Sequence, residues 1–147
     1  MPVIAKNKKA YHDFHILDEY EAGIVLFGTE VKSCRQGNVS LKEGFATIEE
    51  GEVFLHNVHI SPYKEGNMQN VEPTRKRKLL LHKKQIRDIK KATEQKGMTM
   101  VPLSFYTTRG LIKVKLGLAK GKDLHDKREA MKKKESDRKI RNFVSTS

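Results

Sequence analysis

The sequence predicts a mainly β protein: a small closed antiparallel barrel with two or three short helices outside it and a flexible, basic C-terminal tail. Six or seven short stretches have the composition or alternation of strands, and turn residues separate them. Only two stretches with helical spacing interrupt this series, so the regular strand–helix alternation of a parallel sheet is missing. Closing many short strands into a barrel removes their exposed edges, which makes a barrel the expected arrangement.

The expected domain organisation is an arm, a barrel domain and a tail. Residues 1–10 are basic and lack an apolar core, so we expect an N-terminal arm there. Residues 11–118 would form the barrel domain and residues 119–147 the tail. Within the barrel, residues 11–16 alternate well enough for a first strand. The β-branched and aromatic run at 22–27 predicts a buried strand.

A short helix is expected directly after this run. Thr29 is a suitable N-cap, Val31 and Cys34 would face the core, and Gly37 can take the left-handed conformation after the helix end. Cys34 is the only cysteine, so no intrachain disulfide is possible. Nothing nearby would lower its pKa, and we expect a small core residue and not a nucleophile.

The clearest hairpin covers residues 45–56, around the turn Glu49-Glu50-Gly51-Glu52. Its second strand should continue through Val58 and Ile60. Residues 61–75 contain prolines, glycine and amide side chains, and they predict a loop.

The second half of the chain predicts three strands and one longer helix. Basic residues precede a leucine-rich strand that ends at Leu81, and residues 82–97 form the helix, with Ile86 and Ile89 on one face. Two strands follow at 98–106 and 111–116. The last strand alternates apolar residues with lysines: Ile112, Val114 and Leu116 with Lys113 and Lys115. One face of this strand is therefore core and the other basic.

The net charge of +12 and the pI of about 9.8 favour a polyanionic partner, with nucleic acid first and an anionic membrane surface second. Residues 10–73 carry −7, whereas residues 74–96 carry +8 and residues 119–147 carry +5. This asymmetry suggests a defined nucleic-acid face. No apolar run is long enough to span a bilayer, and the N-terminus lacks the apolar core of a signal peptide, so we expect a soluble cytoplasmic protein.

The tail is rich in helix-forming residues, but its large apolar residues are few: Leu124, Met131, Ile140, Phe143 and Val144. They form no apolar face wide enough to dock on a core. We therefore expect a tail that is disordered alone and becomes helical on a partner. A solvated tail that only improves solubility is the alternative.

No pattern in the sequence predicts catalysis, a metal or a cofactor. His56 and His59 would point to opposite faces of a strand, and no further ligands complete a zinc site. Asp18, Glu19 and Glu21 form a carboxylate group on a predicted loop, and no phosphate-binding loop or nucleophile motif occurs.

Binding of RNA on a sheet face is the better interpretation, because no recognition-helix motif for duplex DNA is present. Five aromatic residues are candidates for base stacking, although at such positions each is more often a core residue: Tyr11, Phe14, Tyr63, Phe105 and Tyr106.

Several strings are more specific than composition: NKKAYHDF at 7–14, EAGIVLFGTEVKS at 21–33, RKLLLHKKQI at 77–86, VPLSFY at 101–106 and KVKLGLAKGKDLHDKRE at 113–129. In these strings the chain resembles, colinearly and over nearly its whole length, the small protein B family, the tmRNA-binding (SsrA-binding) proteins of bacteria.

The resemblance implies an oligonucleotide-binding-like (OB-like) barrel without enzymatic activity. It implies binding to the tRNA-like domain of tmRNA, delivery to stalled ribosomes, and trans-translation that rescues the ribosome and tags the nascent chain. The tail would enter the decoding centre and the empty mRNA channel. Elongation factor Tu would be reached through tmRNA, and we expect a monomer without a cofactor or a membrane partner.

The resemblance also assigns site residues. The tmRNA face would involve Asn7, Lys8, Glu21 and Gly23. A carboxylate facing RNA would accept hydrogen bonds from base amino groups or 2′-hydroxyls, or orient a basic neighbour. The alternative is that Glu21 and Gly23 only shape the turn into the buried strand.

In the tail, the resemblance implies a decoding-site motif at Gly121, Lys122, His125, Asp126, Lys127 and Arg128. Gly121 would bend the chain between barrel and tail. His125 would stack on a ribosomal base, while Lys127 and Arg128 would hold phosphates. Two positions depart from the family pattern: Asp123, often basic or neutral, and His125, often Tyr. A structural ribosomal protein or a generic RNA-binding barrel remains the alternative function.

Overall fold

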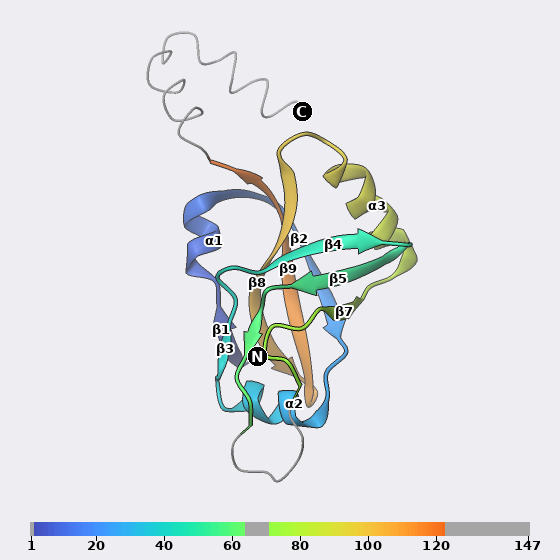
Figure 1. The fold of residues 1–147 in the computed structure, drawn as a ribbon. Helices are drawn as coiled ribbons and strands as arrows, with labels where there is room; N and C mark the ends of the chain where they lie inside the picture. The colour runs from blue at the N-terminus through green and yellow to red at the C-terminus, as the bar shows by residue number, and fades with distance from the viewer. Residues whose placement is uncertain (1, 64–70, 123–147) are drawn as a thin grey trace.

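The computed structural model describes residues 2–63 and 71–122, which form a mainly antiparallel β structure with three short helices (Figure 1). Seven strands make the main sheet: β1 (Val3–Lys6), β2 (Phe14–Ile24), β4 (Phe45–Glu49), β5 (Glu52–His56), β7 (Arg77–Leu80), β8 (Met98–Thr108) and β9 (Leu111–Gly121). A two-stranded sheet contains β3 (Val39–Ser40) and β6 (His59–Ile60). The helices are α1 (Lys8–Asp13), α2 (Gly28–Arg35) and α3 (Lys83–Thr93).

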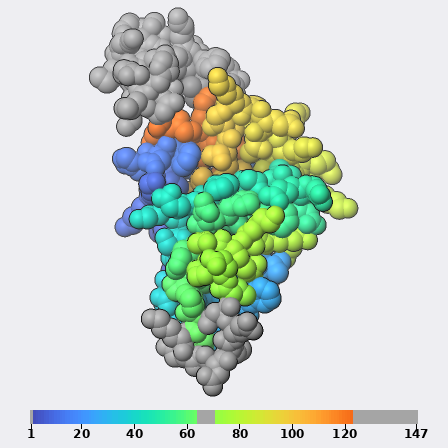
Figure 2. All heavy atoms as spheres, in the orientation of Figure 1, coloured from blue at the N-terminus to red at the C-terminus, as the bar shows by residue number. Residues whose placement is uncertain are grey.

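The main sheet closes on itself. Its strand order is β1-β8-β4-β5-β7-β2-β9, and an additional pairing between β8 and β9 completes a ring. In Figure 1, β4 and β5 cross in front of the long strands β2 and β9, so the outward faces of the two pairs point to opposite sides of the molecule. Figure 2 shows that residues of β4, β5 and α3 cover much of the front.

The ring encloses an apolar core that draws on every large strand. Its fully buried members include Val53, Leu55, Leu79, Phe105, Val114 and Leu116. A smaller apolar cluster packs α1 against β8 and β9; in it, Ala10 lies with Leu103 and Ala119. Within the described ranges, no helix is long and apolar enough to cross a membrane.

The predicted hairpins are confirmed, with tight turns. Glu50 and Gly51 have φ values of 51° and 78°, so a two-residue turn with left-handed residues joins β4 to β5. Arg109 and Gly110 repeat this geometry with φ values of 52° and 77°. This second turn is shorter than the predicted one at 107–110, so β8 and β9 are longer than expected.

The N-terminal predictions were wrong in two respects. The segment expected as a coreless arm contains β1, which pairs with β8, and the buried Ala10. The strand expected at 11–16 begins only at Phe14, because α1 occupies the preceding residues. The Asn7 side chain caps α1 by accepting a hydrogen bond from the Ala10 N–H at 3.0 Å. A six-residue helix has little propensity of its own, so this cap and its packing on β8 hold it.

The run at 22–27 was predicted as a buried strand, but only residues 22–24 belong to a strand, and of these only Ala22 is buried. β2 is one long strand that ends at Ile24, and its alternate residues face outward. Val25 and Phe27 are 46% and 56% exposed. The helix after it begins at Gly28, so Thr29 is not the N-cap; the Glu30 carboxylate accepts from the Phe27 N–H at 2.9 Å.

Two further boundaries differ from the prediction. The strand expected to run from β5 through Ile60 is interrupted at Asn57, whose φ is 60°, and β6 pairs with β3 instead. α3 ends at Thr93, whose hydroxyl donates to the Ile89 carbonyl at 2.8 Å, four residues before Gly97. The expected tail helix lies outside the described residues.

A buried ion cluster joins α2 to β7. Arg77 is 0% and Glu30 is 3% exposed, and the Arg77 Nε donates to Glu30 Oε2 at 2.8 Å. The other Arg77 nitrogens donate to the carbonyls of Val58 and Pro73. Arg75 adds two hydrogen bonds to the same carboxylate. Burial opposes ionisation of Glu30, but these hydrogen bonds outweigh it and lower the Glu30 pKa below its usual value.

Candidate nucleic-acid interface

Glu21 and Gly23 lie on the outward face of β2, between β7 and β9. Glu21 pairs with Lys115 of β9, and Gly23 lies between Leu80 of β7 and Lys113 of β9. The pairing of β2 with β9 therefore places an exposed carboxylate, a glycine and two lysines on one face.

The Glu21 carboxylate is held by a tyrosine of a neighbouring strand. The Tyr106 hydroxyl of β8 donates a short hydrogen bond to Glu21 Oε2. Tyr106 is 6% exposed, and burial followed by this bond raises the pKa of its hydroxyl well above its usual range. On the surface, Lys115 lies 3.7 Å from Glu19. Glu21 is thus an oriented acceptor among lysines, a geometry that suits an amino or hydroxyl donor better than a phosphate.

Gly23 has no side chain that would cover its apolar neighbour, Leu80 of β7. A Cβ at this position would meet the Leu80 side chain at 3.4 Å, an ordinary contact, so the glycine is not required sterically. Leu80 is 51% exposed, and Val25 extends the same outward row. The sequence does not predict the exposure of Leu80 and Val25, because an uninterrupted apolar run conceals which of its members face outward. The pairing of Ile24 with Leu79 determines which side chains point outward.

Asn7 is part of the fold and not of the surface. It is 3% exposed, and its Nδ2 donates to the carbonyls of Leu41 at 3.1 Å and Pro102 at 2.8 Å. With the Ala10 bond, every polar atom of its side chain is engaged within the protein. Lys8, the next residue, is exposed on α1.

The structure separates the predicted site residues into two groups. Gly121 pairs with Phe14, and the Lys122 N–H donates to the Asp13 carbonyl at 2.9 Å, so both lie beside the C-terminal end of α1, the helix that carries Lys8. Gly23 is nine residues further along β2 than Phe14, which is roughly 30 Å at about 3.3 Å per residue. Gly121 does not have a positive φ. His125, Asp126, Lys127 and Arg128 lie outside the described residues.

Among the described residues, no group of three histidine, cysteine or acidic side chains could hold a metal ion. His56 and His59 belong to different strands. Cys34 is fully buried, and burial raises the pKa of its thiol to about 12, so it is not a nucleophile at neutral pH.

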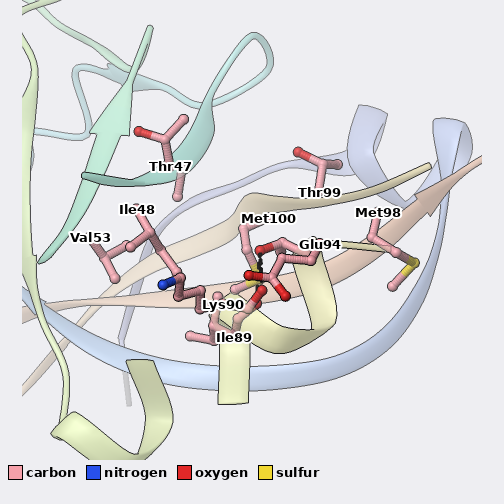
Figure 3. A pocket seen from close by; sticks show the side chains of 11 residues that line it. Thr47, Ile48, Val53, Ile89, Lys90, Glu94, Met98, Thr99 and Met100 are labelled. Carbon is pink, nitrogen blue, oxygen red and sulfur yellow. Dashed lines mark hydrogen bonds between the residues drawn. The ribbon is translucent and has the colours of Figure 1, made fainter. Parts of the chain in front are cut away.

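Two hollows lie away from the Glu21–Gly23 face. One, of about 340 Å³, is lined mainly by apolar side chains between α3 and strands β4 and β8, with Lys90 and Glu94 from α3 (Figure 3). It opens where β4 pairs with β8 only through Ala46 and Met100. The other, of about 210 Å³, lies between α1 and β4 and is lined in part by Lys9 and Phe45. At the second hollow, Lys9 is paired with Asp13 at 3.5 Å and with Glu43 at 3.6 Å.

Comparison with known proteins identifies the family. The family described as "SmpB protein" matches residues 4–146, almost the entire chain. The chain belongs to the SmpB family. Members of this family are similar to it along both the described core and the segment beyond Lys122.

Individual SmpB relatives are close. The SsrA-binding protein of Halothermothrix orenii is 58% identical over 139 residues, which cover 95% of this chain and 90% of the relative. That of Geobacillus kaustophilus is 56% identical over 138 residues, covering 94% and 89%. A solved structure from work on "tmRNA-SmpB: a journey to the center of the bacterial ribosome" superposes with a TM-score of 0.72 at 51% identity, covering 89% of this chain and 95% of the other.

Proposed function

We propose that this protein binds tmRNA, the SsrA RNA, and acts with it on the ribosome in trans-translation. The observation that carries this is family membership over residues 4–146, together with SsrA-binding relatives that are 56–58% identical. A protein of this family is an RNA-binding protein and not an enzyme, and the inert Cys34 agrees with that.

The RNA-facing surface of this proposal is the outward face of β2, β7 and β9. The closed ring of strands supports an OB-like barrel, whose sheet face binds unpaired nucleotides. Glu21 accepts hydrogen bonds from the tRNA-like domain, Gly23 and Leu80 allow close approach, and Lys113 and Lys115 hold phosphates. Asn7 acts indirectly, by fixing the helix that presents Lys8.

The second part of the proposal is that the segment from Gly121 onward works on the ribosome. It starts beside α1, about 30 Å along the strands from Gly23. There the decoding-site motif His125, Asp126, Lys127 and Arg128 would enter the decoding centre and the empty mRNA channel. Elongation factor Tu is engaged through tmRNA, and the protein acts as a cytoplasmic monomer.

A competition gel-shift tests the function. Purified protein is titrated against the tRNA-like domain of tmRNA at physiological salt, with an ordinary tRNA as competitor. Salt is held at this level because a protein of net charge +12 binds any RNA at low ionic strength. Tight binding that excess tRNA does not displace is expected. Equal displacement by tRNA would instead favour a generic RNA-binding or structural ribosomal protein.

A further inference from the structure

Phe27 is an aromatic residue that the core does not use. It lies three residues after the end of β2 and is the N-cap of α2, two residues along the chain from the exposed Val25. Its side chain is 56% exposed. Of the five aromatics expected to stack on bases, Phe105 and Tyr106 are buried, whereas Tyr11 is 46% exposed on α1, away from this face. Phe27, Val25 and Leu80 are all exposed, and several apolar side chains gathered on one surface favour a partner there more than a single one would.

The ring is fixed from one side by Arg75. Its guanidinium carbon lies 4.7 Å from the centre of the Phe27 ring. The guanidinium is itself immobilised: Nε and Nη2 donate to Glu30 at 3.1 and 2.6 Å, Nη2 also to the Val25 carbonyl at 3.2 Å, and Nη1 to the Lys76 carbonyl at 3.1 Å. Since Glu30 is buried and bonded to Arg77, Arg75 cannot move away easily. One face of the phenyl ring is thus covered by a cation, and the exposed area belongs to the rest of the ring.

The surroundings favour a nucleobase as the occupant. Val25 and Leu80 continue the apolar surface toward the Glu21–Gly23 face, so the ring is contiguous with the proposed RNA surface. Lys78 faces the same side, where it pairs with Glu52 at 3.0 Å, and Lys113 lies across from Gly23. An apolar, planar platform with cations beside it matches an unstacked base and its phosphate better than it matches an apolar peptide.

We propose that Phe27, held by Arg75, is the stacking platform for an unstacked base of the bound RNA. This rests on the proposed function and adds a specificity-determining residue to it. Phe27 contacts the base, and Arg75 is a positioning residue, because all of its nitrogens are already engaged within the protein.

Binding of the tRNA-like domain of tmRNA to full-length Phe27→Leu tests the platform. Leucine keeps an apolar side chain but removes the aromatic face, so affinity should fall by about 5- to 100-fold, the range for loss of one base–aromatic stack. The slope of affinity against salt should not change, because no phosphate contact is lost. Phe45→Leu is the matched control: Phe45 is 36% exposed on β4, whose outward face points to the opposite side, and its affinity should match wild type.

Tryptophan fluorescence can distinguish contact between residue 27 and the RNA from a purely structural role of the ring. The chain contains no tryptophan, so F27W introduces a single reporter that keeps the aromatic platform. It should bind within about threefold of wild type, and RNA should quench its emission, whereas F45W should not be quenched. Arg75→Lys should weaken binding of a still folded protein and reduce the quenching of F27W, because the ring is no longer held.

Three outcomes would overturn the platform. One is wild-type affinity for folded Phe27→Leu. Another is absence of quenching in an F27W protein that binds RNA. A third is Phe27→Leu that binds RNA normally but fails in tagging on ribosomes, which would assign the ring to a protein or ribosomal contact. These results differ from failure of the proposed function, in which wild-type protein itself would not prefer the tRNA-like domain over tRNA.

Discussion

At the scale of single residues, the buried carboxylate of Glu30 is a central contact of the fold. It accepts hydrogen bonds from Arg75, from Arg77 and from the Phe27 N–H at the start of α2. Removing one partner of a buried pair leaves the other charge uncompensated. Glu30→Ala should lower the free energy of unfolding by about 3–5 kcal/mol in urea titrations at pH 7. Glu43→Ala, an exposed carboxylate 3.6 Å from Lys9, should leave it unchanged.

The same carboxylate predicts acid sensitivity. The Glu30 pKa is lower in the folded protein than its unfolded value of about 4.3. Its stabilisation is therefore fully present above that value and is lost as the pH falls through the folded pKa. Urea midpoints of wild type and Glu30→Gln, followed from pH 7 downward, should converge in acid. Parallel curves would contradict this role.

Tyr106 predicts a loss of stability at alkaline pH, in contrast to the loss at acid pH that Glu30 predicts. Its pKa is raised by burial and by the bond to Glu21, so the folded state keeps the proton that the unfolded state loses near pH 10. Stability is then complete below about pH 10 and falls as the pH rises toward the folded pKa. Thermal melts between pH 8 and 11 should show a shallower decline for Tyr106→Phe than for wild type. An identical slope would show that other groups cause the loss.

At the scale of elements, two glycines predict contrasting effects on strand packing. A Cβ on Gly44, before β4, would lie 2.8 Å from both Pro102 Cγ and Val58 Cγ2, whereas a Cβ on Gly121 would meet nothing within 4 Å. Gly44→Ala should destabilise by about 1–3 kcal/mol, as expected for overpacking. Gly121→Ala should leave the melting temperature unchanged, and a large loss there would show that the end of β9 is strained.

Elements with a strong local signal were predictable, and those held by distant partners were not. The hairpin of β4 and β5 is encoded by its turn residues, and α3 by the spacing of Ile86 and Ile89. Helix α1 was missed because its cap, Asn7, also bonds to Leu41 and Pro102, residues remote in sequence. No local pattern reports such bonds.

At the scale of the whole molecule, the β2–β9 ladder separates the proposed RNA face from the start of the C-terminal segment. A protein that ends at Lys122 keeps every described strand but loses eight basic and five acidic residues. Because only a net +3 is removed, affinity for the tRNA-like domain at physiological salt should fall less than tenfold. Tagging of stalled chains in a reconstituted translation reaction should be abolished. Tagging at the wild-type level would show that the core alone suffices.

The sequence by itself determined the β-rich class, the tight turns, the basic second half and the family strings, because these depend on neighbouring residues and on composition. Only the tertiary structure decided which members of the run at 22–27 face outward, that Asn7 is an internal cap, and that Gly121 and Lys122 lie beside the end of α1. Those outcomes follow from ring closure and from the buried cluster around Glu30, where segments tens of residues apart meet. Pairing across such distances is set by the packing of the whole chain, which local periodicity does not contain.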